Sequence, residues 1–313
     1  MQLPVLKNEN VEEMTLGKKH SEFFLKFFGG CMMMANKVRH SLQGYKKPRL
    51  IDTKDYESIV TYDKSVVDSY EHWLKFYLPD VSFENKNILE LGPGADLGVA
   101  SILLAKGVAR YSALDAHNLL STMDKSFYDY LLSELKKEYK LSEEKWSKIA
   151  DSINSNLLGD SDAQINYVAD PKFDVSSLKL SKSLDIILSH AAFEHFSDVD
   201  KLFISLDVVV KKGTVLIAQV DLQTHSRIIK DMDPNNIYRF SKSFYKLCSF
   251  SGSPNRLRPE DYASILEKNG WKNIRVVPIK MLSKNGEIKW LNTNYKNNDN
   301  MDILVCMLLA QKK

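Results

Sequence analysis

A glycine-rich turn between an apolar run and a helical pattern constrains the fold of this chain most strongly. Residues 88–91 form a short, mostly apolar run that stops at Gly92 and Gly94, and residues 96–106 have the character of a helix. Glycine lets a ligand approach the backbone closely because no Cβ intrudes, and the following helix presents free N–H groups. The pattern predicts a buried strand, a ligand-binding turn and a helix.

A second apolar run, residues 109–114, follows the helix and ends at Asp115. Strand, helix and strand in this order form a βαβ unit, which builds parallel sheets. An acidic side chain at the end of the second strand can accept hydrogen bonds from both ribose hydroxyls of an adenosine. The glycine turn and Asp115 together therefore predict a site for a nucleoside-containing ligand.

The alternation of strands and helices continues to the end of the chain. Further strands are expected over residues 165–168, 184–189, 214–220, 274–279 and 303–309, and further helices over residues 199–210 and 258–270. We interpret residues 86–313 as one α/β domain with two insertions, helical over 117–163 and irregular over 222–258. Residues 1–85 are expected to form a mostly helical N-terminal extension.

The extension carries an apolar stripe at helical spacing. The stripe consists of Phe24, Phe28, Cys31, Ala35, Val38 and Leu42. Gly29 and Gly30 are expected to weaken or break this helix. The extension suits a lid, a dimer contact or a membrane-surface helix, and a face packed on the core is the commoner use of such a stripe.

A dinucleotide is the main alternative ligand. The dinucleotide fingerprint needs glycine where this chain has Leu97, and its third glycine, Gly98, comes one residue late. Glu90 would repel a pyrophosphate but suits the ammonium of a methionine moiety. Glu90 can also serve only to order the loop. These residues favour a cofactor without phosphates.

Two segments then resemble a known family. Residues 88–94 with 113–115 resemble the first two motifs of class I S-adenosylmethionine-dependent methyltransferases, and residues 184–195 resemble the fourth-strand motif of that superfamily. The resemblance implies a doubly wound, mostly parallel, seven-stranded Rossmann-like sheet with the last strand antiparallel. A looser resemblance links the second insertion to methyltransferases encoded with bacterial glycan genes.

The resemblance also implies which residues bind S-adenosylmethionine. Gly92 and Gly94 would contact the methionine part, Asp115 the ribose, and Asp170 the adenine amino group, unless Asp170 is an ordinary loop acid. The complete implied set is Glu90, Gly92, Pro93, Gly94, Asp115, Ala116, Asp170, Ser189 and His190. Ser189 and His190 would line the floor near the methyl sulfonium.

Catalytic groups are expected where strands four and five end. Methyl transfer is an in-line displacement that needs alignment and often a base. We expect His225 to be the base, oriented by Asp221, although Asp221 can instead cap a turn. Glu194 and His195 are further candidates, or organise the fold. No tight metal-ligand spacing is present, so no metal is expected.

The second insertion carries basic and amide groups on the substrate side. The candidate substrate-binding residues are Arg227, Arg239, Asn255, Arg256 and Arg258. Arg256 and Arg258 can hold a phosphate or carboxylate in a bidentate manner, or pair with Glu260 and Asp261. A small-molecule or glycan-like acceptor, methylated on a hydroxyl, fits this layout.

Charge and cysteine content limit the partners. A net charge of +3 in 313 residues, without an aromatic-rich basic stripe, gives no reason to expect a nucleic acid partner. Three cysteines without paired spacing are typical of reduced, cytoplasmic proteins. Two other functions stay open at this point, an NAD(P)-dependent oxidoreductase and a non-catalytic cofactor-binding partner protein.

Overall fold

The computed structural model describes residues 6, 10–16, 20–43, 54–160, 164–180, 183–283 and 290–313. Within these residues, one sheet of eight strands has the order β1-β7-β8-β6-β5-β2-β3-β4. The strands are β1 (Glu12–Met14), β2 (Asn87–Leu91), β3 (Arg110–Asp115), β4 (Ile165–Ala169), β5 (Leu184–His190), β6 (Val210–Asp221), β7 (Trp271–Leu282) and β8 (Ile303–Lys312).

The strand directions confirm the predicted α/β sheet. Strands β4, β3, β2, β5 and β6 are parallel, and the last strand, β8, is antiparallel to both β6 and β7. The predicted number of seven strands is wrong by one, because β1 adds a parallel strand beside β7. Three residues are too few to give an alternating pattern, so the sequence offered no signal for β1.

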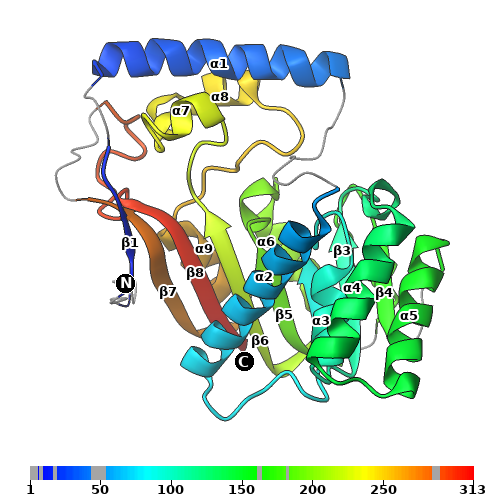
Figure 1. The fold of residues 1–313 in the computed structure, drawn as a ribbon. Coiled ribbons are helices and arrows are strands. Elements are labelled where there is room, and N and C mark those ends of the chain that lie inside the picture. Colours follow the sequence, from blue (N-terminus) through cyan, green and yellow to red (C-terminus); the bar gives the residue numbers. More distant parts are fainter. Residues whose placement is uncertain are drawn as a thin grey trace.

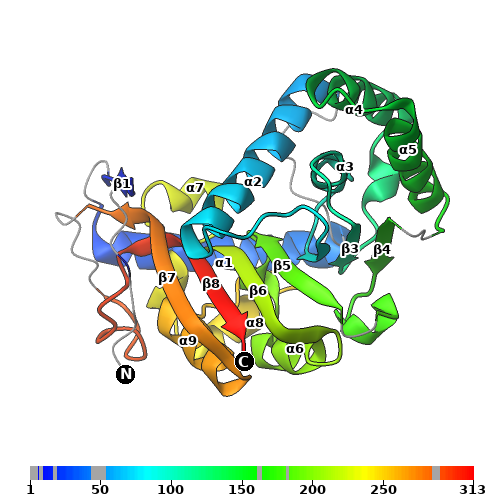
Figure 2. The same cartoon turned by 90° about the horizontal axis from the view of Figure 1, so that it is seen from below.

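Helices cover both faces of the sheet, as expected for a doubly wound fold (Figure 2). The helices are α1 (Glu22–Gln43), α2 (Tyr56–Tyr77), α3 (Gly98–Ala105), α4 (Lys125–Glu138), α5 (Glu143–Leu157), α6 (Val199–Leu206), α7 (Arg227–Lys230), α8 (Lys242–Cys248) and α9 (Pro259–Lys268). Helices α2 to α5 lie on one face and α6 and α9 on the other. The helices α4 and α5 lie within residues 117–163, the segment predicted to be a helical insertion.

Two cores form on the two faces. On the first face Val67 and Tyr70 of α2 and Leu103 of α3 are fully buried against the sheet. On the second face Phe203 of α6 and Leu266 of α9 are equally buried. Helix α2 belongs to the N-terminal extension in sequence, yet it packs directly on the sheet that carries the glycine turn.

Helix α1 lies across the carboxyl end of the sheet, above α7 and α8 (Figure 1). It runs unbroken through Gly29 and Gly30, so the expected break is absent. A Cβ at Gly29 would overlap the side chain of Asn236, and one at Gly30 would lie 3.3 Å from the Phe240 ring. The two glycines therefore let α1 pack closely on the second insertion.

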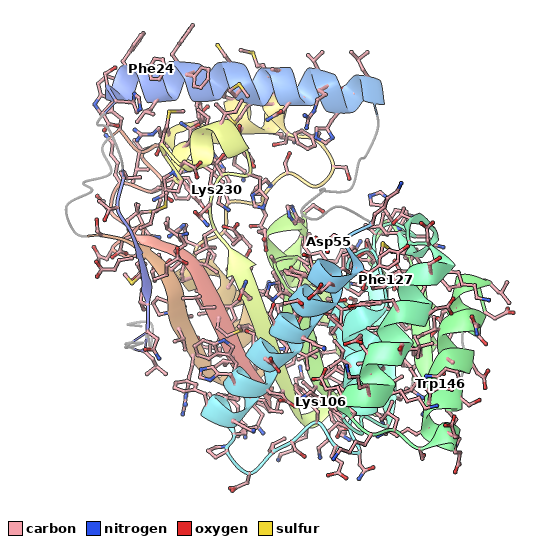
Figure 3. All side chains as sticks on the ribbon, viewed as in Figure 1. Phe24, Asp55, Lys106, Phe127, Trp146 and Lys230 are labelled. Atoms are coloured by element: carbon pink, nitrogen blue, oxygen red, sulfur yellow. The ribbon has the colours of Figure 1, made fainter. Side chains whose placement is uncertain are left out.

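The apolar stripe predicted for α1 is largely exposed instead of buried. Phe24 of α1 (labelled in Figure 3) is 42% exposed and Leu42 is 81% exposed, whereas Leu25 is buried. The close contact of Gly29 and Gly30 with the second insertion determines which side of α1 faces the protein. Within the described residues, no helix combines the length and apolar character needed to cross a membrane. Cys31, Cys248 and Cys306 form no disulfide.

Candidate functional site

The glycine turn lies where β2 ends at the carboxyl edge of the sheet. Gly92 and Gly94 have φ angles of +74° and +89°, a region that glycine adopts without strain. A Cβ at Gly92 would lie 2.5 Å from the Ala192 Cβ, whereas nothing lies within 4 Å of the corresponding position at Gly94. Gly92 is thus needed for packing against the end of β5, and Gly94, next to Pro93, borders open space.

Asp115 ends β3 beside this turn. Its carboxylate accepts backbone hydrogen bonds from Gly94, Ala116 and His117, the last at 3.1 Å. Burial raises the pKa of Asp115, and these N–H groups lower it. The structure therefore brings the predicted ribose acid and the glycine turn together.

Asp170 follows β4, the neighbour of β3. Its backbone N–H donates to the Asp115 carbonyl at 2.8 Å, so the two acids lie at adjacent strand ends. The Asp170 carboxylate accepts from the Lys172 N–H at 2.8 Å. This local turn satisfies part of the carboxylate, as in an ordinary loop acid, while its place matches the predicted adenine side.

Glu90 faces the α2 side of the sheet and is buried. Tyr70 of α2 donates to its Oε1 at 2.9 Å, and the Tyr111 hydroxyl donates to Oε2. Burial raises the pKa of Glu90 to about 7, although both tyrosine bonds lower it. Glu90 therefore joins α2 to the sheet. This contact matches the loop-ordering role more directly than contact with a methionine ammonium.

Two carboxylates occupy the start of α3. The Asp96 Oδ1 accepts from the Gly98 N–H at 2.8 Å, and a Cβ at Gly98 would overlap the carboxylate of Asp63 from α2. Asp63 is buried, and burial raises its pKa well above the ordinary range, with Asp96 and Glu90 adding to the effect. The Gly98 N–H at the start of this helix thus already donates to a carboxylate of the protein, that of Asp96.

Ser189 and His190 end β5, next to β2. The Ser189 hydroxyl donates to the Leu91 carbonyl at 2.9 Å and is fully buried. The His190 ring packs edge-on against Tyr62 and Tyr70 of α2, and burial lowers its pKa to about 4. Both residues lie at the carboxyl edge, as predicted, with His190 on the face covered by α2.

Glu194, His195 and His225 form a cluster where β5 and β6 end. Glu194 and His195 lie in the 3-10 turn η3 (Phe193–His195), and His225 follows β6. The His225 Nε2 lies 3.9 Å from the Glu194 Oε1, and the two imidazole rings pack edge to face with centroids 4.8 Å apart. One ligand atom from each of the three residues lies within 4.8 Å of the other two. Three predicted catalytic residues therefore meet.

Burial controls the charges in this cluster. It raises the pKa of Glu194 well above its usual range, and it lowers the pKa of His195 to about 4. It also lowers the pKa of His225, although Asp221 opposes the shift. Both imidazoles, of His195 and His225, are therefore mostly neutral, and each keeps a lone pair.

Asp221 does not make the predicted hydrogen bond to His225. Its carboxylate binds Lys230 at 2.8 Å and accepts from the N–H and the side-chain amide of Gln223 at 2.9 Å. The His225 Nδ1 faces the Gln223 carbonyl instead, at 3.1 Å. The carboxylate near the His225 Nε2 is that of Glu194, which the sequence placed on a different strand exit.

The second insertion supports the cluster through Asn255 and Gly252. The Asn255 N–H donates to the Glu194 carbonyl at 2.6 Å, and its side-chain amide donates to the Phe193 carbonyl at 2.9 Å. The Gly252 carbonyl faces the His195 Nδ1 at 2.6 Å. Asn255 was predicted to contact substrate, but its observed contacts hold the turn η3. Gly252 was not predicted, since a loop glycine carries no side-chain signal.

The predicted substrate arginines hold the insertion together. Arg239 is buried between Asp233 and Glu22, and thereby ties α1 to this segment. Arg256 donates to the backbone carbonyls of Ile237 and Phe240. Neither side chain faces an open site, so a grip on an anionic substrate is not observed.

Arg258 is fully buried and donates to the carbonyls of Asn300 and Ile303. It does not bind the acids of α9 through its guanidinium, although its backbone N–H donates to Asp261 at 2.8 Å. Arg227 begins α7, and its side chain lies outside the described residues. In the sequence these arginines belong to an irregular insertion. Only the fold shows that the described side chains among them point into the protein.

The strand order identifies the fold. From β4 to β6 the order is the third, second, first, fourth and fifth strands of a doubly wound sheet, with β8 inserted antiparallel beside β6. The glycine turn lies at the first of these strands, next to the point where the strand order reverses. The chain has a doubly wound, Rossmann-like fold that fits a methyltransferase.

Solved structures of methyltransferases are similar to this chain. The CurJ carbon methyltransferase shares 13% identity and a TM-score of 0.46 over 93% of this chain and 68% of its own. A methyltransferase from Aquifex aeolicus shares 16% identity and a TM-score of 0.41 over 84% and 100%. Phosphoethanolamine N-methyltransferase 2 from Haemonchus contortus shares 16% identity and a TM-score of 0.39 over 72% and 46%. No family model and no curated protein matches the sequence.

Proposed function

We propose that the chain transfers a methyl group from S-adenosylmethionine to a hydroxyl of a small-molecule or glycan-like acceptor. The relationship of Asp115 to Gly94 carries the proposal. A half-buried carboxylate at the end of β3 is fixed by the N–H of a glycine that borders open space. A ribose can bind the carboxylate there while the rest of the ligand lies against the turn.

The start of α3 supports S-adenosylmethionine over a dinucleotide. A dinucleotide places its pyrophosphate at the N-terminus of the first helix. Here the carboxylates of Asp63 and Asp96 lie at that end, and the buried Leu97 precedes the helix. Two acids and an apolar side chain disfavour a pyrophosphate, whereas they do not oppose a ligand without phosphates.

The cluster of Glu194, His195 and His225 supports a binding place for the methyl acceptor. It lies at the ends of β5 and β6, beyond the glycine turn at β2, so the acceptor can reach the methyl group from this side. Bound S-adenosylmethionine supplies an electrophilic methyl group. In the metal-free protein, the His225 Nε2 takes the acceptor proton, and the negative charge of Asp221 favours the resulting imidazolium.

Calorimetric titration of the full chain with S-adenosylmethionine, S-adenosylhomocysteine and NAD tests the cofactor. We expect both adenosyl ligands to bind and NAD not to bind. Asp115→Ala is expected to abolish adenosyl binding, because the ribose loses its acceptor. Binding of NAD alone, or unchanged affinity of Asp115→Ala for S-adenosylhomocysteine, contradicts the proposal.

Turnover is tested by transfer of tritiated methyl groups to fractions of a cell extract. A labelled acceptor that resists base treatment as an ether does is expected for a hydroxyl target. Protein that binds both adenosyl ligands and labels no fraction supports a non-catalytic cofactor-binding role instead.

A further inference from the structure

We propose that Glu194, His195 and His225 bind one divalent transition-metal ion of the zinc class. Each residue offers one ligand atom, and the three atoms lie within 4.8 Å of one another. The existence of the site depends only on these residues. The part that the ion plays in catalysis rests on the proposed methyl transfer.

Both imidazoles are held in the tautomer that metal ligation needs. The Nδ1 of His195 lies 2.6 Å from the Gly252 carbonyl, and the Nδ1 of His225 lies 3.1 Å from the Gln223 carbonyl. A carbonyl only accepts, so each Nδ1 carries the proton and each Nε2 keeps its lone pair. Metal-ligating histidines characteristically donate their other N–H to a backbone carbonyl in this way.

Glu194 supplies an unsatisfied carboxylate at the same point. It is 2% exposed, and neither of its side-chain oxygens has a hydrogen-bond partner of good geometry, although the N–H groups of Glu194 and Asp221 lie nearby. Lys230, whose charge acts on Glu194, is itself bound to Asp221. A buried carboxylate without a partner is costly, and a metal ion beside it removes that cost.

The ligand set selects the metal. Two imidazole nitrogens and one carboxylate suit zinc and similar transition metals, whereas magnesium and calcium prefer oxygen ligands alone. Zinc ligands at about 2.0–2.2 Å from the ion lie about 3.4 Å from one another in a tetrahedron. The ligand atoms, 3.9 Å apart for His225 and Glu194 and within 4.8 Å of one another for all three, must therefore move inward to hold an ion.

Three protein ligands leave a fourth position open, as in catalytic zinc sites. The His225 side chain is 34% exposed, while Glu194 is enclosed, so the open position lies toward solvent. An acceptor hydroxyl bound there loses its proton to solvent more readily, because the ion stabilises the resulting oxyanion. In the metal-loaded protein, His225 is then a ligand, and the ion replaces it in activating the acceptor.

The test uses the full chain without a histidine tag, treated with a chelator and titrated with Zn²⁺ in a calorimeter. We expect one ion per chain in the wild type. His225→Ala and Glu194→Gln are expected to lower the affinity about 100-fold or more, because each removes one of three ligands. His225 is on the exposed side, so His225→Ala is the variant best able to fold. His72→Ala removes an exposed imidazole on α2 and should bind Zn²⁺ as the wild type does.

Absence of stoichiometric Zn²⁺ binding, or wild-type affinity in a folded His225→Ala protein, overturns the metal site. Titration of the chelated protein with S-adenosylhomocysteine keeps the two proposals apart. Loss of Zn²⁺ binding in His225→Ala with intact S-adenosylhomocysteine binding supports the site. A wild type that binds Zn²⁺ but no adenosyl ligand overturns the proposed function and leaves the metal site standing.

Discussion

The His225 Nε2 lies 3.9 Å from the Oε1 of Glu194, although the two residues follow different strands of the sheet. Asp221, only four positions before His225, binds Lys230 and Gln223 instead. The observed pairing is therefore between residues at the ends of β5 and β6, and not within one loop. Such a pairing places both side chains at the carboxyl edge, where ligands of open α/β sheets bind.

Asn255→Ala is expected to lower turnover without lowering cofactor affinity. The side-chain amide of Asn255 donates to the backbone carbonyls of Phe193 and Phe196, and so positions the turn η3. Loss of these bonds should lower Zn²⁺ affinity and turnover roughly 10–100-fold, as with other supporting residues of metal sites. Zn²⁺ titration, steady-state kinetics and S-adenosylhomocysteine titration measure the three quantities.

Asn269→Ala is the control for this variant. Asn269 also uses its amide in two hydrogen bonds, to Asp200 and Ile265, but lies at the end of α9. Both variants should lose about 1–3 kcal/mol of unfolding free energy. If Asn269→Ala loses as much turnover as Asn255→Ala, the effect is general destabilisation and Asn255 has no positioning role.

Gly94→Ala is expected to weaken adenosyl binding in a folded protein. Gly94 has a φ of +89° and no atom within 4 Å of a Cβ position, so the methyl group clashes with nothing in the protein. It would project into the space assigned to the cofactor. We expect S-adenosylhomocysteine affinity to fall roughly tenfold or more, equivalent to about 1.4 kcal/mol.

Gly159→Ala provides a closely matched comparison. Gly159 has a φ of +90° and equally open surroundings, but it follows α5, away from the turn. Each alanine should cost about 1–3 kcal/mol of stability through backbone strain. Equal S-adenosylhomocysteine affinities for the two variants would place the cofactor elsewhere.

The sequence predicted the sheet well because local patterns encode it. The glycine turn and the apolar runs around Asp115 depend on neighbours in the chain, and the structure confirms the strands that they indicate. The roles of Arg256 and Arg258 were not accessible in this way. Their partners are backbone carbonyls, of Ile237 and Ile303 among others, and any residue type supplies a carbonyl. The contacts of these two arginines thus depend on long-range packing, which the residue types do not reveal.

The proposed metal site also could not be predicted from local sequence patterns. Glu194 and His195 adjoin in sequence, but His225 comes from the next strand exit, so no short ligand spacing announces the site. The tautomers depend on the carbonyls of Gly252 and Gln223. A loop carbonyl leaves no trace in a sequence pattern.

Glu90→Gln is expected to make stability less dependent on pH. Burial, with a smaller contribution from Asp96, raises the Glu90 pKa from 4.5 to about 7, although the hydrogen bonds from Tyr111 and Tyr70 lower it. The native state therefore holds this proton more tightly than the unfolded state. The resulting stability is fully present below pH 4.5 and is lost as the pH rises through about 7.

Urea unfolding of both proteins at pH 5 and pH 8 measures this dependence. Between these values the wild type should lose about 2–3 kcal/mol more unfolding free energy than Glu90→Gln does. Other titrating groups, such as His190, are present in both proteins and cancel in the difference. Parallel losses in the two proteins would show that Glu90 is ionised alike in both states.

Gly29→Ala tests whether close packing fixes α1, because two effects predict opposite signs. Helix propensity alone favours alanine by about 1 kcal/mol. The new Cβ, however, would overlap Asn236, which is 1% exposed and donates to the Leu25 carbonyl and to Asp233. Asn236 cannot move without breaking these bonds, so α1 must shift outward.

We therefore expect Gly29→Ala to lower the unfolding free energy and to speed amide hydrogen exchange throughout α1. Gly30→Ala is the graded comparison, because its Cβ would lie 3.3 Å from the Phe240 ring and needs only a small adjustment. A Gly29→Ala protein more stable than the wild type, with unchanged exchange in α1, would mean that propensity outweighs the contact. Faster exchange in α1 with normal exchange in α2 would show that α1 can leave while the sheet and the glycine turn stay folded.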